Sequence, residues 1–152
     1  MAAATAWIVT FDGDFRAALG AREMVHLVET PVLVDIPQTP SYCQQILIWE
    51  DEMLPVIDLT AWFSGRPANR DCASVAIVGW QEQPESPPQY GALLFTGIPQ
   101  RVEVQDEQVC DLPELSTMRS WCDIAMSCFD HEGQPTPILD LPTLFSGALT
   151  TL

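Results

Sequence analysis

Asp58 and Asp140 occupy matching positions in two similar segments of the sequence, which makes them candidates for a pair of catalytic carboxylates. Each ends a Pro-apolar-apolar-Asp pattern, 55–58 and 137–140, and each is followed by Leu. Two carboxylates in equivalent positions could act as a general acid and a general base, as in a hydrolase. Aspartate is also a leading N-cap residue, and both positions precede short helix-like segments. No nucleophile is paired with a base in the sequence, so we expect two helix caps and no catalytic residues.

A second cluster near the C-terminus has side chains that could bind a metal ion. It contains Cys122, Cys128, Asp130 and His131. Zinc sites usually draw on closely spaced ligand pairs, and this sequence offers no matching second pair. We therefore expect no metal site, and we expect Cys122 and Cys128 to be core residues of the last hairpin.

Two further polar features suggest chemistry only weakly. The run Glu50-Asp51-Glu52 offers carboxylates to Ca²⁺, but three consecutive residues cannot converge on one ion as an alternating loop does. A solvated turn is the expectation there. His26 could serve as a base, yet it lies in no nucleophile motif. A half-exposed strand position at an interface suits it better.

Several enzyme classes are excluded by what the sequence lacks. There is no Lys, which rules out a Walker A loop, a Schiff-base lysine and a Ser-Lys dyad. Neither G-x-S-x-G nor G-x-G-x-x-G occurs. We expect a protein that is not an enzyme and that has no cofactor.

The charge of the chain limits its partners and its location. Six basic residues against 21 acidic ones give a net charge of −15, which argues against nucleic acid and against an anionic membrane surface. No apolar run approaches the ~20 residues of a membrane span, and the N-terminus has no basic, apolar signal sequence. Five cysteines without C-x-x-C spacing suit free thiols in a reducing compartment. We expect a cytoplasmic protein without membrane insertion.

The aspartates belong to a longer internal repeat, which indicates how the chain is built. Residues 50–65 and 132–147 share Glu, Pro, Asp, Leu, Phe, Ser and Gly at matching positions. Each copy reads as a polar turn, a short apolar strand, a capping Asp and a short helix that ends at Gly65 or Gly147. Two copies in one chain indicate a duplicated lobe within a single unit spanning 1–152.

Short elements are expected throughout. Hydrophobic residues make up 47% of the chain, and 13 Pro and eight Gly divide it into short segments, which favours an all-β fold. Asp12-Gly13 is a hairpin signal. The Pro-rich stretch 81–88 predicts a mobile, solvated loop, and 111–118 a turn of helix. We expect about ten strands, at 7–11, 15–19, 24–28, 44–49, 53–57, 74–80, 90–95, 102–104, 124–129 and 136–139.

The central block resembles the CheW-like domain family. The resemblance rests on Ile36-Pro37-Gln38-Thr39-Pro40-Ser41-Tyr42-Cys43, then on the apolar strand 46–49, then on Leu54-Pro55-Val56-Ile57-Asp58-Leu59. It extends over the chain, with Tyr90 to Phe95 and Pro137 to Leu141 resembling later strands of the family. It implies two SH3-like five-stranded β-barrel lobes with short helical turns and a hydrophobic core between them.

The resemblance also implies a function. Members are non-enzymatic adaptors that couple chemoreceptor cytoplasmic tips to the regulatory domain of a CheA-type histidine kinase. Related adaptors act in twitching motility through type IV pili. The alternative here is a divergent member that docks a different, more basic partner in pilus control without binding a kinase.

Departures from the family pattern select the contact residues we expect. The family's Arg-Gly is Glu50-Asp51 here, its Asn is Ile48, and its Val-x-Glu-Ile corresponds to Met24, His26 and Leu27. The charge order across the two strands is thus reversed, and we expect His26 and Glu50 to face each other as a pair. Alternation in strand 46–49 leaves one face for the barrel and the other for a partner. The expected partner-binding residues are Met24, His26, Leu27, Ile48, Glu50 and Asp51.

Overall fold

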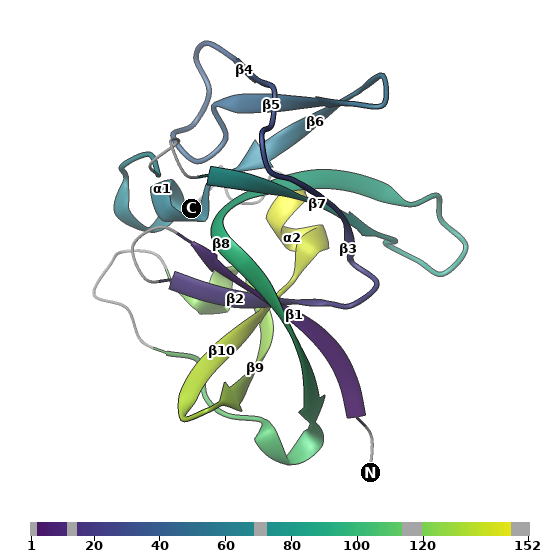
Figure 1. The fold of residues 1–152 in the computed structure, drawn as a ribbon, viewed down its shortest axis with the longest axis vertical. Helices are drawn as coiled ribbons and strands as arrows, with labels where there is room; N and C mark the ends of the chain where they lie inside the picture. Colours follow the sequence, from purple (N-terminus) through teal and green to yellow (C-terminus); the bar gives the residue numbers. More distant parts are fainter. Residues whose placement is uncertain (1–2, 12–14, 69–72, 114–119, 147–152) are drawn as a thin grey trace.

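The computed structural model describes residues 3–11, 15–68, 73–113 and 120–146. Within them the chain forms one ten-stranded sheet with short helical segments (Figure 1). The elements are β1 (Ala3–Phe11), β2 (Phe15–Gly20), β3 (Met24–Val28), β4 (Leu33–Asp35), β5 (Gln45–Trp49), β6 (Glu52–Ile57), α1 (Leu59–Ser64), β7 (Ala73–Trp80), β8 (Gln89–Gln105), the 3-10 turns η1 (Asp106–Gln108) and η2 (Trp121–Asp123), β9 (Ala125–His131), β10 (Gln134–Leu139) and α2 (Leu141–Phe145).

One long strand, β8, joins two lobes. Its residues 89–96 pair antiparallel with β7, and its residues 100–105 pair antiparallel with β1. The chain bends between these parts at Gly97, whose φ of 75° is a left-handed conformation that glycine adopts without steric cost.

The lobes are defined by this division of β8. The first lobe contains β3, β4, β5, β6, β7 and the first part of β8, and the second contains β1, β2, β9, β10 and the remainder of β8. In Figure 1 the first lobe is at the top and the second at the bottom. The predicted all-β architecture of two SH3-like barrel lobes with short helical turns is confirmed.

The two copies of the repeat occupy matching surroundings. In the first, β6 pairs parallel with β8 through Val56 and Ile57, and in the second, β10 pairs parallel with β2 through Ile138. The backbone N–H of Asp58 donates to Tyr42 O at 2.8 Å, and that of Asp140 donates to Ile124 O at the same distance. Each strand then leads into its helix, α1 or α2.

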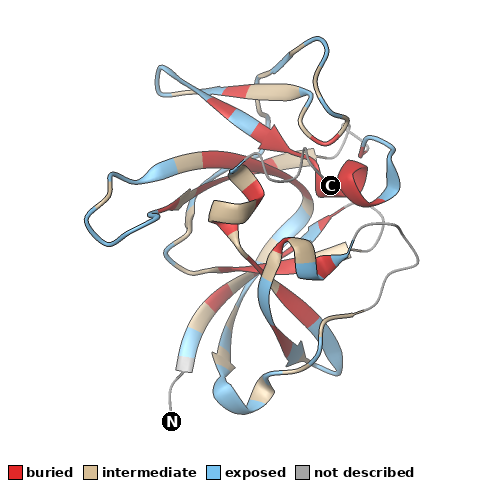
Figure 2. Ribbon diagram, turned by 180° about the vertical axis from the view of Figure 1, so that it is seen from behind, coloured by how far each residue is buried: buried red, intermediate tan, exposed pale blue. Residues whose placement is uncertain are grey.

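The helices pack reciprocally between the lobes. The ring of Phe63 on α1 lies 5.0 Å from the ring of Phe15 on β2 and 4.7 Å from that of Trp121 on η2, the turn just before β9. Both β2 and β9 belong to the second lobe. The ring of Phe145 on α2 stacks 4.9 Å from Trp80 on β7. Figure 2 shows α1 almost entirely buried. The largest apolar cluster draws on both lobes and both helices, so the main core lies between the lobes.

Several expectations on the elements need correction. Tyr90–Phe95 and Val102–Val104 are parts of one strand, β8, and the Pro-rich segment after β3 contains the short strand β4. Cys122 is exposed on η2 and is not a core residue, whereas Cys128 is buried as expected. The Asp12-Gly13 turn, Gly147 and most of the predicted helical turn at 111–118 lie outside the described residues.

Candidate functional site

The outward face of strands β4, β5 and β6 is apolar. Alternation directs Leu33, Leu47 and Leu54 inward, in one cross-strand row. The neighbouring residues face outward in two rows, and we call them the β4–β6 outer face: Val34, Ile46, Ile48, Met53 and Pro55.

This face is exposed where a monomeric protein usually places polar side chains. Met53 is 71% exposed, Ile48 46% and Val34 42%. Val32, just ahead of β4, is 69% exposed. Contiguous exposed apolar residues commonly mark a protein-binding surface.

The β5–β6 hairpin ends in an acidic tip beside the outer face. Glu50 and Asp51 have φ values of 47° and 66°, and Trp49 pairs with Glu52 across them. This is a two-residue type I′ turn built without glycine. Glu50, Asp51 and Glu52 are all exposed, which agrees with the predicted solvated turn.

Strand β3 places the three remaining sequence-predicted contact residues. The β3–β7 register shifts between Met24 and His26, which marks a bulge at Val25. His26 and Leu27 are exposed, while Met24 is half-buried and packs against the shared core. His26 and Leu27 are therefore open to a partner, and Met24 helps to anchor the strand.

The expected pairing of His26 with Glu50 is wrong. Strand β3 pairs with β7, whereas β5 pairs with β4 and β6. The two residues thus lie on strands that are not neighbours in the sheet. Among the residues described, no ion pair within 4.0 Å joins them.

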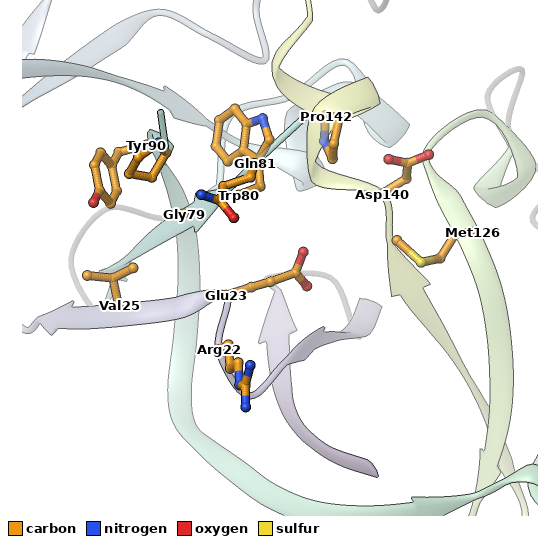
Figure 3. Close-up of a pocket in the computed structure, with 11 residues that line it drawn as sticks. Arg22, Glu23, Val25, Gly79, Trp80, Gln81, Tyr90, Met126, Asp140 and Pro142 are labelled. Atoms are coloured by element: carbon orange, nitrogen blue, oxygen red, sulfur yellow. The ribbon is translucent and has the colours of Figure 1, made fainter. Parts of the chain in front are cut away.

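A pocket of about 540 Å³ lies between the lobes (Figure 3). It is lined from the first lobe by the ends of β3, β7 and β8, and from the second by β9 and the start of α2. Figure 3 shows Glu23 and Met126 facing this space, with Arg22 turned away. The residues that line it are Arg22, Glu23, Val25, Gly79, Trp80, Gln81, Pro88, Tyr90, Met126, Asp140 and Pro142.

The pocket combines apolar walls with a weakly solvated carboxylate. Partial burial raises the pKa of Glu23 above its ordinary value, the hydrogen bond from the Gly20 N–H at 2.8 Å opposes this, and the charge of Asp140 adds to it. The buried indole Nε1 of Trp80 has no hydrogen-bond partner among the described residues. The pocket thus offers both apolar contact and polar groups to a bound segment.

The two aspartates of the repeat act as helix caps, as predicted. Asp58 accepts from Ala61 N at 3.1 Å and from Ala68 N at 2.9 Å. Asp140 accepts from Thr143 N at 3.5 Å and from the Thr143 hydroxyl at 3.0 Å. Asp58 is only 3% exposed, so its carboxylate is held by the backbone and is inaccessible to a substrate.

Neither a metal-binding cluster nor a membrane-spanning helix is found in the part of the chain that the structure describes. No three His, Cys, Asp or Glu side chains gather there in a way that could hold a metal ion. In the same residues, no helix combines the length and apolar character needed to cross a membrane.

Sequence reasoning missed part of both surfaces. Met53 could have been found, because the register of a two-residue turn places it opposite Ile48. Val34 could not, because β4 was not expected as a strand. The residues of the inter-lobe pocket come from separate segments, and no local pattern signals that they converge.

The chain thus combines a two-lobed β fold with an exposed apolar strand face and an inter-lobe pocket. The model of the CheW-like domain family matches residues 13–149. The chain therefore belongs to the CheW-like domain family, whose members are scaffold and adaptor domains of chemotaxis signalling.

A solved structure has the same fold. The chain is similar to the scaffolding protein TtCheW from Thermoanaerobacter tengcongensis, with a TM-score of 0.71 and 16% identity over 90% of this chain and 89% of that one. A comparison with curated proteins gives no significant match.

Proposed function

We propose that this protein is a non-enzymatic adaptor that joins a CheA-type histidine kinase to chemoreceptor cytoplasmic tips in the cytoplasm. The observation that carries the proposal is the β4–β6 outer face. It is apolar, exposed and built on three paired strands. A rigid strand face of this kind suits a folded partner domain, and we assign it to the regulatory domain of the kinase.

The inter-lobe pocket suits a different kind of partner. Its apolar walls, formed in part by Trp80, Tyr90 and Met126, can take the side chains of a helix laid between the lobes. We assign it to the receptor tip. Exposed His26 and Leu27 on β3 continue the surface from Val25, which lines the pocket.

Calorimetric titration with the kinase regulatory domain tests the proposal. Ile48→Asp puts a charge on the outer face and should weaken binding by roughly 10- to 100-fold, as loss of an interface anchor does. Ile98→Asp is the matched control, because Ile98 is 93% exposed on β8 and lies outside that face. Equal affinities for the two variants would contradict the assignment.

The acidic hairpin tip favours a second candidate, a CheW-like protein that docks a more basic partner in type IV pilus control without binding a kinase. The exposed tip adds three acidic residues to a chain of net charge −15, and such charge steers association with basic surfaces. Binding to a basic pilus-control protein that weakens steeply with salt, with no kinase binding, would favour this candidate. Glu50→Arg should weaken that binding and shift preference toward partners of the usual family type.

A further inference from the structure

Two cysteine thiols meet in the second lobe, at positions that belong to neither proposed binding surface. The Sγ atoms of Cys110 and Cys128 are 3.4 Å apart. Both cysteines are free. Cys128 lies on β9, and Cys110 lies in the segment that follows η1.

The backbone holds these cysteines opposite each other. Val109 and Phe129 form an antiparallel bridge, and the Cys110 N–H donates to Cys128 O at 3.0 Å. Directly opposed residues at a hydrogen-bonded position of an antiparallel pair have Cα atoms about 5.5 Å apart, which falls within the range spanned by disulfides. Forming the bond requires the sulfurs to approach by roughly 1.4 Å, to the ~2.05 Å of a disulfide.

We propose that Cys110 and Cys128 are a redox modification site that forms an intramolecular disulfide by exchange with a low-molecular-weight disulfide. The bond fastens the segment 106–113 to β9. It is independent of the adaptor function proposed above, because neither cysteine lies on the β4–β6 outer face or lines the inter-lobe pocket.

The order of the steps follows from exposure. Cys110 is half-exposed, whereas Cys128 is 2% exposed. Burial and the contact with Cys110 raise the pKa of the Cys128 thiol to about 12, so Cys128 is a poor first nucleophile. Cys110 therefore meets the reagent first.

The exchange balances in two displacements. The Cys110 thiol loses its proton and attacks one sulfur of the reagent, whose S–S bond breaks and releases one thiol that takes up a proton. Cys128 then loses its proton and attacks the Cys110 sulfur, displacing the second thiol. The two protein thiols are oxidised to one disulfide, and the reagent disulfide is reduced to two thiols.

Peptide mapping of the full chain tests the proposal, with bis(2-hydroxyethyl) disulfide as a neutral probe. After incubation, alkylation and trypsin digestion, cleavage at Arg101 and Arg119 separates Cys110 from Cys128. We expect the two peptides to be joined by a bond that dithiothreitol breaks. Repeating the map in Cys122→Ser assigns the bond, because that peptide otherwise contains both Cys122 and Cys128.

A thermal measurement tests whether the bond fastens the segment. The oxidised protein should melt roughly 5 °C higher than the reduced one, since the cross-link restricts the unfolded chain. The shift should vanish in Cys110→Ser and persist in Cys122→Ser. A mixed disulfide that stays on Cys110, two free thiols after treatment, or a bond that disappears in Cys122→Ser would overturn the proposal.

Discussion

At the residue scale, the equivalent turns of the two repeats differ in one informative position. Glu50-Asp51 and Glu132-Gly133 both form two-residue turns with positive φ at both positions. The second copy has glycine at φ 83°, whereas the first has aspartate at φ 66°. A non-glycine residue in the left-handed region is strained, although Asp tolerates it better than most.

Asp51→Gly should therefore stabilise the protein. We expect the free energy of unfolding to rise by roughly 0.5–1 kcal/mol, because glycine relieves the strain and one charge leaves the acidic tip. Gly133→Asp is the control and should lower stability by a similar amount. Urea denaturation of both variants measures this, and a destabilised Asp51→Gly would show that Asp51 makes a contact worth more than the strain.

The two capping aspartates should respond differently to the same change. Each carboxylate oxygen of Asp58 accepts a hydrogen bond from a backbone N–H group. In Asp58→Asn one of these oxygens becomes an NH₂ group, so a side-chain donor would face a backbone donor. We expect a loss of about 1–3 kcal/mol in the free energy of unfolding. Asp140→Asn should cost under about 1 kcal/mol, because the Thr143 hydroxyl can rotate to accept. Thermal or urea denaturation of the pair checks this order, and equal losses would contradict it.

At the scale of the elements, the two short helices hold the lobes together. Neither helix is long enough to be stable alone. Each is fixed by its capping aspartate and by aromatic contacts with the other lobe. The ring of Phe145 on α2 also lies close against Gly91 on β8, where an added Cβ would collide with it.

Gly91→Ala should loosen the seating of α2. We expect a loss of roughly 1–3 kcal/mol in the free energy of unfolding, because the added methyl group displaces the ring from its place against Trp80. Phe145→Ala removes the obstacle, so Gly91→Ala should cost less in that background. A double-mutant cycle by urea denaturation measures the coupling, and additive losses would contradict the contact.

At the scale of the whole molecule, most of the fold could be predicted from the internal repeat. The turn, strand, capping Asp and helix of each copy could be predicted from short stretches of sequence, and the presence of two copies indicated two lobes. Gly97 and Pro99 separate the predicted strands 90–95 and 102–104, and both residue types commonly end a strand. In the structure β8 runs through both positions, with a bend at Gly97. A local sequence pattern cannot reveal that one strand passes from one lobe to the other. The resemblance in the central block supplied the barrel type.

The candidate site was harder to predict than the fold, because it too depends on contacts between segments that are distant in the sequence. Ile48 was found because alternation and the hairpin are local features. The predicted His26–Glu50 pair failed because strand adjacency is a property of the whole sheet. The inter-lobe pocket forms only when both lobes are packed, so Glu23, Trp80 and Met126 gave no signal in the sequence.

The proposed adaptor role depends on binding of the kinase regulatory domain to the β4–β6 outer face. The most direct test is a titration of ¹⁵N-labelled protein with that unlabelled domain, followed by amide NMR. We expect the largest shifts in residues 33–35, 45–49 and 52–57, with β9 and β10 unchanged. Shifts centred on β9 and β10, or none at saturating kinase domain, would contradict it.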